Sequence, residues 1–82
     1  MRYEALERVI LKNLHRVETG LKEKSLMCAV EVEMDRYDLT TNEFEDVIRS
    51  LEDKGLVDRH TTLIGDTVWG ITAMGRDALK GL

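Results

Sequence analysis

The sequence predicts an α+β domain in which a three-helix core is followed by a C-terminal β-hairpin and a final short helix. Apolar residues recur at three- and four-residue steps in the first two thirds of the chain, which is typical of helices that bury one face. Downstream of Gly55, two β-rich runs flank a short segment that contains a glycine, as in a hairpin. A last helical pattern begins after Thr72, so most helical patterns precede the strands, as in α+β folds.

The size and composition of the chain indicate one globular domain over residues 1–82. Its 82 residues are too few for two cores, while a hydrophobic content of 43% is enough to form one. Domains of this size are typically stable by only about 3–5 kcal/mol, so a homodimer would add useful burial. No apolar run approaches the length of a membrane span, and the N-terminal segment lacks the apolar core of a signal peptide. We therefore expect a cytoplasmic protein without a membrane partner.

The first helix is expected over residues 2–17, where apolar residues fall on one face at helical spacing. Gly20 follows the last of them and is a natural terminator, because glycine tolerates the left-handed backbone found after helix ends. Residues 21–24 are then expected to form a short extended piece. The apolar face of the helix consists of Tyr3, Leu6, Ile10, Leu14 and Val17.

Residues 25–35 fit two structures. Ser25 can cap a helix with an apolar stripe, but the alternation of apolar and acidic residues over 30–34 also fits a strand. The helix is preferred because the next helix needs a packing partner close by. A helix would place Cys28 and Val32 on a second apolar patch. That patch indicates either a central helix buried on most sides or a dimer contact, and the first interpretation is favoured.

The third helix, expected over residues 41–54 after a turn at 36–38, has the clearest boundaries. Thr40 is expected at its N-cap, and Glu43 lies three residues on, where its side chain can complete a capping box. Gly55 is expected just past the last turn, in a left-handed conformation. The buried stripe is predicted to be Phe44, Val47, Ile48 and Leu51.

The hairpin is expected from strands at 56–62 and 67–71. Between them, Gly65-Asp66 is predicted to form a tight turn of the primed type, which these residue types favour. Thr72 can then cap a final helix over residues 73–80. The apolar anchors of this helix are predicted to be Met74, Ala78 and Leu79.

Charge is unevenly distributed along the chain. The net charge is −4, but residues 1–24 carry six bases and four acids, whereas residues 25–54 carry three bases and nine acids. Residues 55–82 carry three of each. A DNA-binding domain normally shows a basic face, so the acidic middle third bears directly on function.

The residue content argues against catalysis, a cofactor or a metal site. No Gly-rich phosphate loop and no nucleophile elbow occur in the sequence. Cys28 is the only cysteine and lies among apolar residues, where it is expected to be an inert core thiol. His15 and His60 fall in different predicted elements without a nearby cysteine, so a four-ligand zinc site is not expected. We therefore expect no enzyme activity and no cofactor.

The order of elements and two short motifs resemble the winged helix-turn-helix superfamily. In many members the third helix ends in L-x-x-x-G-L-[IV], which is present here from Leu51 to Val57. The second wing strand then runs into [LI]-T-x-x-G-x-x-x-L, which is present from Ile71 to Leu79. The resemblance covers nearly the whole chain. It also includes Leu39, Phe44, Val47 and Trp69.

This resemblance implies a small DNA-binding protein that regulates transcription. The helix at 41–54 would read the major groove of double-stranded DNA, and the wing at 57–71 would touch the backbone. Asn42 could pair with adenine and Arg49 with guanine, although Arg49 could instead pair with an acid one turn away, such as Asp53. The residues implied to contact DNA are Thr40, Thr41, Asn42, Arg49, Arg59, His60, Thr61 and Thr62.

The charge pattern keeps a second function open, in which the protein binds another protein. The helix face that would meet DNA carries Asn42, Asp46, Arg49 and Asp53, and its acids would repel phosphates. Bases near the N-terminus could compensate through flanking contacts. An acidic winged helix could otherwise mimic DNA toward a basic protein partner, or serve in dimerisation. The expected wing tip at Leu63-Ile64 would add exposed apolar surface for such a contact.

Overall fold

The protein is described here by a computed structural model that covers residues 2–17, 19–35 and 40–80. The predicted turn at 36–38, together with Leu39, lies outside the described residues. Within them, four helices and three strands occur in the predicted order, which confirms the α+β class. The elements are α1 (Arg2–Arg16), β1 (Leu21–Lys22), α2 (Glu23–Met34), α3 (Thr41–Asp53), β2 (Val57–Thr61), β3 (Thr67–Ile71) and α4 (Ala73–Lys80).

The second helix shows where local sequence signals gave the wrong boundary. α2 is a helix, as preferred, but it begins at Glu23 rather than after Ser25. Lys22 occupies the N-cap position and provides no side-chain cap hydrogen bond. The predicted capping role of Ser25 was therefore wrong, because the extended piece before the helix stops after only two residues.

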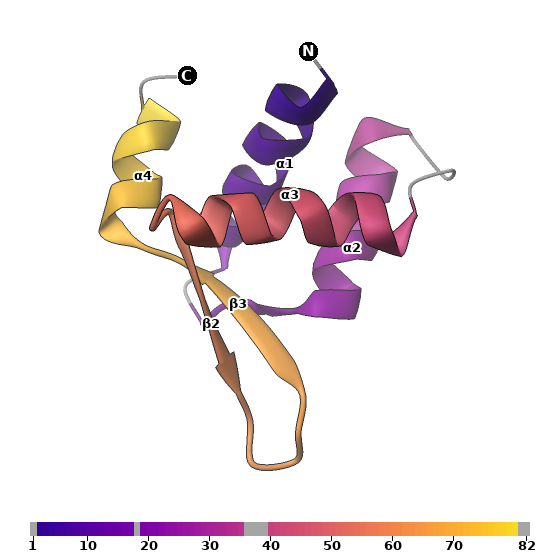
Figure 1. Ribbon diagram of the computed structural model, residues 1–82, viewed down its shortest axis with the longest axis vertical. Coiled ribbons are helices and arrows are strands. Elements are labelled where there is room, and N and C mark those ends of the chain that lie inside the picture. Colours follow the sequence, from indigo (N-terminus) through magenta and orange to yellow (C-terminus); the bar gives the residue numbers. More distant parts are fainter. Residues whose placement is uncertain (1, 18, 36–39, 81–82) are drawn as a thin grey trace.

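The three strands form one antiparallel sheet in the order β1-β3-β2. Trp69 of the central strand faces Leu21 of β1 on one side and Arg59 of β2 on the other. β1 thus adds a third strand to the predicted hairpin. Figure 1 shows that the hairpin of β2 and β3 extends well beyond the helices, which is the shape expected of a wing.

The core lies between α1, α2, α3 and the sheet. α1 contributes Leu6, Ile10 and Leu14 as predicted, whereas Val17 beyond its end is only partly buried. The side chain of Tyr3 lies outside the described residues. The predicted stripe of α3 is confirmed, since its four members are at most 3% exposed: Phe44, Val47, Ile48 and Leu51.

Three positions expected to be apolar contacts are exposed. Cys28 lies on the exposed side of α2 and Val32 is 66% exposed, so this helix buries one side, through Leu26 and Val30. The predictions of a helix buried on most sides and of a core thiol were therefore wrong. The neighbours of Cys28 in sequence are apolar, but the helical rotation of about 100° per residue turns its side chain away from theirs. Met74, a predicted anchor of α4, is likewise 60% exposed.

The end of α3 forms a C-cap that depends on glycine. Gly55 has a φ of 77°, in the left-handed region that glycine enters readily. Its N–H donates to the carbonyl of Glu52 at 2.9 Å, and the N–H of Leu56 donates to the carbonyl of Leu51 at 3.0 Å. These two bonds form a Schellman motif, which ends the helix and turns the chain toward β2. The predicted position of Gly55 is confirmed.

The start of α4 packs directly against this cap. Thr72 donates its backbone N–H to the carbonyl of Leu56 at 3.0 Å and its hydroxyl to the carbonyl of Gly55 at 2.7 Å. The same hydroxyl accepts from the N–H of Gly75 at 3.0 Å, as expected of a helix cap. A Cβ at the buried Gly75 would overlap the carbonyl oxygen of Leu56. The two motifs identified in the sequence therefore meet in space, and we call Gly55, Leu56, Thr72 and Gly75 the junction.

The hairpin turn differs from the predicted one. The N–H of Gly65 donates to the carbonyl of Thr62 at 2.9 Å, and the N–H of Thr62 donates to the carbonyl of Asp66 at 2.9 Å. The loop therefore consists of Leu63, Ile64 and Gly65, of which only the glycine has a positive φ, 90°. A primed two-residue turn at Gly65-Asp66 was the wrong prediction. The strand pairing extends far enough to leave three residues, and the glycine supplies the left-handed position that such loops need.

Candidate nucleic-acid interface

The outward side of α3 is exposed to solvent. Asn42, Asp46, Arg49 and Asp53 all have exposed side chains, as predicted from their spacing of three and four residues. In Figure 1, α3 runs across the front of the molecule, and the hairpin projects below it. A major groove about 12 Å wide admits a helix presented in this way. We call these four residues the outward face of α3.

Thr40 and Thr41 lie at the N-terminal end of α3. The hydroxyl oxygen of Thr40 accepts a hydrogen bond from the N–H of Glu43 at 3.1 Å, which confirms the predicted N-cap. Lys24 of α2 lines the same hollow as Thr41. A base therefore lies beside the end of α3 where the helix dipole is positive. Glu23 also lines this hollow, so the charge of Lys24 is partly offset there.

The four wing residues predicted to touch DNA do not form one surface. Successive side chains of a strand point to opposite faces of the sheet. Arg59 and Thr61 therefore share the face that carries Trp69, while His60 lies on the other face. The hydroxyl oxygen of Thr62 accepts a backbone hydrogen bond at 3.1 Å within the turn. Only two of the four residues are thus on the side of the wing that faces the helices.

Arg59 is held by two contacts that the sequence did not indicate. Its Nε lies 3.7 Å from Oε2 of Glu52, in the last turn of α3. Its Cζ lies 5.7 Å from the ring centroid of Trp69, a distance suited to a cation–π interaction. The ring is 2% exposed, and its Nε1 donates to Oε1 of Glu23 at 3.3 Å. Glu52 and Trp69 thus belong to the candidate interface, although neither was among the predicted site residues.

Several bases that were expected to support DNA binding pair with acids of the same chain. Glu33 of α2 lies 3.4 Å from the Nζ of Lys12 and 3.6 Å from a guanidinium nitrogen of Arg16. Lys22 lies 3.0 Å from Asp66. These pairs are partly exposed, so a competing phosphate can reach them, but their charge is already offset. The N-terminal bases therefore compensate for the acidic helix less than their number suggests.

Arg49 differs from these bases. In the part of the chain that the structure describes, its guanidinium forms no ion pair. The alternative pairing with an acid one turn away, such as Asp53, is therefore not seen. Its side chain is exposed in the middle of the outward face and is available to an external acceptor.

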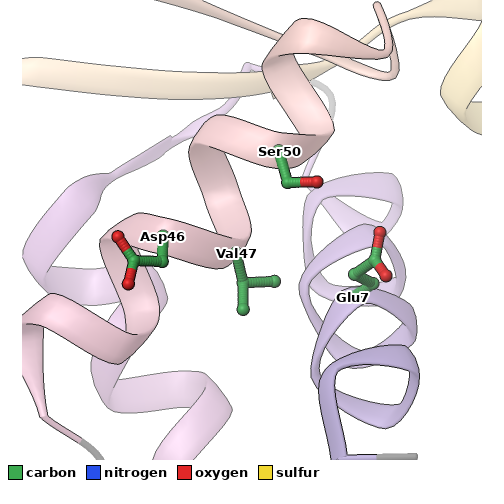
Figure 2. Close-up of a pocket in the computed structure, with 4 residues that line it drawn as sticks. All are labelled: Glu7, Asp46, Val47 and Ser50. Atoms are coloured by element: carbon green, nitrogen blue, oxygen red, sulfur yellow. The ribbon is translucent and has the colours of Figure 1, made fainter.

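A hollow lies between α1 and α3 (Figure 2). It is lined by Glu7 of α1 and by Asp46, Val47 and Ser50 of α3. Figure 2 shows the carboxylate of Asp46 turned away from Glu7. Glu7 itself accepts from the Nζ of Lys54 at 3.0 Å. With two carboxylates in its lining, the hollow is not suited to phosphate or another anion.

The described residues contain no group of three or more His, Cys, Asp and Glu side chains placed to hold a metal ion. Across the same ranges, no helix combines the length and the apolar character needed to cross a membrane. His15 and Cys28 are both exposed, on different helices.

The fold is similar to that of solved proteins. A transcriptional regulator of the MarR family from Silicibacter pomeroyi matches with a TM-score of 0.77 and 17% identity, over 93% of this chain and 47% of that one. SSV1 F-93 matches with a TM-score of 0.75 and 22% identity, over 93% of this chain and 79% of that one. This chain thus spans about half the length of the MarR-family protein. No protein-family model matches the chain, and no curated protein matches it. Together with the order of the elements, the wing and the junction, these likenesses show that the chain has a winged helix-turn-helix fold.

Proposed function

We propose that the protein is a DNA-binding regulator of transcription that places α3 in the major groove and its wing along the adjacent backbone. The observations that carry the proposal are the outward face of α3, which exposes Asn42 and Arg49, and the hairpin that projects beyond the helices (Figure 1). The likeness in fold to a protein described as a transcriptional regulator supports it.

The spacing on the outward face suits base recognition. Asn42 and Arg49 are two turns apart, about 10 Å along the helix axis, which corresponds to roughly three base pairs. The amide of Asn42 matches the edge of adenine, and the guanidinium of Arg49 matches guanine. Asp46 lies between them and can accept from the amino group of cytosine. One acid that repels the backbone can therefore contribute to reading the bases.

The charge of the surface predicts modest affinity. Phosphate contacts supply most non-specific binding, and each one steepens the dependence of log affinity on log salt by about 0.9. Lys24, Arg49 and Arg59 are the described bases best placed to contact the duplex. Because Arg49 is proposed to contact a base and Arg59 is already paired with Glu52, a shallow slope of about −1 to −2 per protomer is expected. A homodimer would place two such surfaces on adjacent half-sites, and both would contribute to the affinity for DNA.

A titration with mixed-sequence duplex DNA at low salt, followed by NMR residue by residue, tests the proposal. Chemical-shift changes are expected on the outward face of α3 and along β2 and β3, with little change in α4. Sedimentation of the same sample reports whether the protein is a homodimer. Absence of any shift at low salt would contradict DNA binding.

The role of Arg49 as a base reader needs a matched control. Arg76 of α4 is exposed and forms no ion pair among the described residues, so its removal changes the net charge equally. We expect Arg49→Ala to weaken binding to a duplex selected from a random pool by about 1–3 kcal/mol relative to a random duplex. Arg76→Ala should leave that difference unchanged. Equal losses on both duplexes in Arg49→Ala would remove it from the reading role.

A second function, binding of a basic protein partner, is favoured by the wing tip and by the acids of α3. Leu63 is 107% exposed and Ile64 is 82% exposed, so the wing tip presents two adjacent apolar side chains to a partner. The same NMR experiment separates the two functions. Shifts with a basic partner protein, and none with duplex DNA, would replace the first proposal by the second.

A further inference from the structure

One base of the candidate interface is already occupied by an acid of the recognition helix. We propose that Glu52 is a positioning residue that lowers the affinity of the protein for DNA by holding Arg59 against α3. The inference rests on the proposed function, because it concerns how strongly the wing engages the phosphate backbone.

The arrangement around Arg59 is set by the sheet. In the register of β2 and β3, Arg59 lies directly opposite Trp69, so both side chains are on one face. The indole ring is buried, and its hydrogen bond to Glu23 links it to α2. The guanidinium sits 5.7 Å from the ring centroid and reaches across to α3, where its Nε is 3.7 Å from Glu52. The ring and the carboxylate together orient the guanidinium toward the helix.

Glu52 lies on the edge of α3 that faces the wing. It is three residues beyond Arg49, so it flanks the outward face on the same side as β2. A backbone phosphate that enters the space between α3 and the wing therefore meets the carboxylate of Glu52 where it would meet Arg59. The phosphate must replace this carboxylate as the partner of the guanidinium, and it is repelled by the carboxylate while doing so.

The contact is open enough to be exchanged. The side chains of Arg59 and Glu52 are 52% and 33% exposed, and exposed ion pairs of this kind are weak. A DNA phosphate can thus replace Glu52 as the partner of Arg59, but the contact then contributes less to the binding free energy. The pair sets the affinity of the wing without preventing binding.

The test compares Glu52→Gln with Asp53→Asn, using fluorescence-detected titration of a mixed-sequence duplex over a range of salt concentrations. Both changes remove one negative charge from the last turn of α3, but Asp53 forms no ion pair in the described structure. We expect Glu52→Gln to tighten binding about two- to fivefold more than Asp53→Asn, because it also frees Arg59. The slope of log affinity against log salt concentration should be steeper by about 0.9 for Glu52→Gln than for Asp53→Asn, as for one added phosphate contact.

Repeating both changes in an Arg59→Gln background shows whether Glu52 affects DNA affinity through Arg59. If Glu52 acts through Arg59, the extra gain of Glu52→Gln disappears there, while the smaller gain of Asp53→Asn remains. Equal gains for the two variants, or a gain that persists without Arg59, would overturn the inference and leave the proposed function standing. Failure of every variant to bind duplex at low salt would overturn both.

Discussion

The outward face belongs to α3, whereas the junction joins the turn after α3 to the start of α4, and different interactions determine the two regions. At the junction, Thr72 satisfies the carbonyls of Gly55 and Leu56, and Gly75 leaves no room for a side chain. The outward face contains exposed polar and charged residues and no such close contact. Substitutions at the junction should therefore cost folding free energy, whereas substitutions on the outward face should change what the protein binds.

Gly75→Ala is expected to have the largest effect and tests whether the junction contributes to folding free energy. Helix propensity alone predicts that alanine in α4 stabilises the protein by about 1 kcal/mol. The overlap of a Cβ with the Leu56 carbonyl, and its 2.7 Å approach to Ile71, predict instead a loss of about 3 kcal/mol. Urea denaturation measures the free energy of unfolding. Asp77→Ala, at an exposed position of α4, controls for propensity and should stay within about 0.5 kcal/mol. A Gly75→Ala protein at least as stable as the original would show that the junction is not closely packed.

Thr72→Val comes next in size. Valine keeps the shape of threonine, but it removes the hydroxyl that donates to Gly55 and accepts from Gly75. A loss of about 1–2 kcal/mol in unfolding free energy is expected, since a cap and a hydrogen bond disappear together. Thr61→Val, on the exposed part of β2, is the matched control and should have little effect. Similar results for the two threonines would mean that the hydroxyl of Thr72 does not hold α4 in place.

Thr40 tests the boundary between the two regions, because it belongs both to the fold and to the candidate interface. Its side chain caps α3, so Thr40→Ala should cost about 1 kcal/mol of stability. Thr41→Ala should cost much less, since Thr41 is the first exposed residue of the helix proper. Thermal unfolding by circular dichroism reports both. The interpretation of Thr40 as a structural cap would be wrong if the two variants melted at the same temperature.

The smallest expected effect is at the wing tip. Ile64→Ser removes an apolar side chain that is 82% exposed, so the unfolding free energy should change by less than about 0.5 kcal/mol. Chemical denaturation under the same conditions as for the junction variants allows a direct comparison. A larger loss would show that Ile64 is buried in solution, most simply in a homodimer.

Prediction from the sequence succeeded where the relevant contacts are local. The spacing of Phe44, Val47, Ile48 and Leu51 determines one helix face, and the cap at Thr40 needs only a residue three positions away. These patterns repeat within one or two turns, so tertiary packing does not need to be known. The same reasoning gave the order of the elements and the position of Gly55.

Prediction failed where distant segments set the geometry. α2 begins at Glu23 because β1 ends there, and β1 exists because Leu21 and Lys22 pair with β3. The hairpin loop follows from the pairing of Thr61 with Thr67 and from the hydrogen bond of Thr62 to Asp66, which make Gly65 the third loop residue rather than the first. These pairings cannot be predicted from neighbouring residues along the chain.

For the candidate interface, the sequence by itself determined the composition of α3: its length, its buried side and the acids and bases of its outward face. Only the tertiary structure decided which bases are available. It pairs Arg59 with Glu52, pairs Lys22 with Asp66 and leaves Arg49 without an ion pair among the described residues. The physical reason is that helix periodicity depends on adjacent residues, whereas the electrostatic state of a side chain depends on whatever the fold brings within a few ångströms of it.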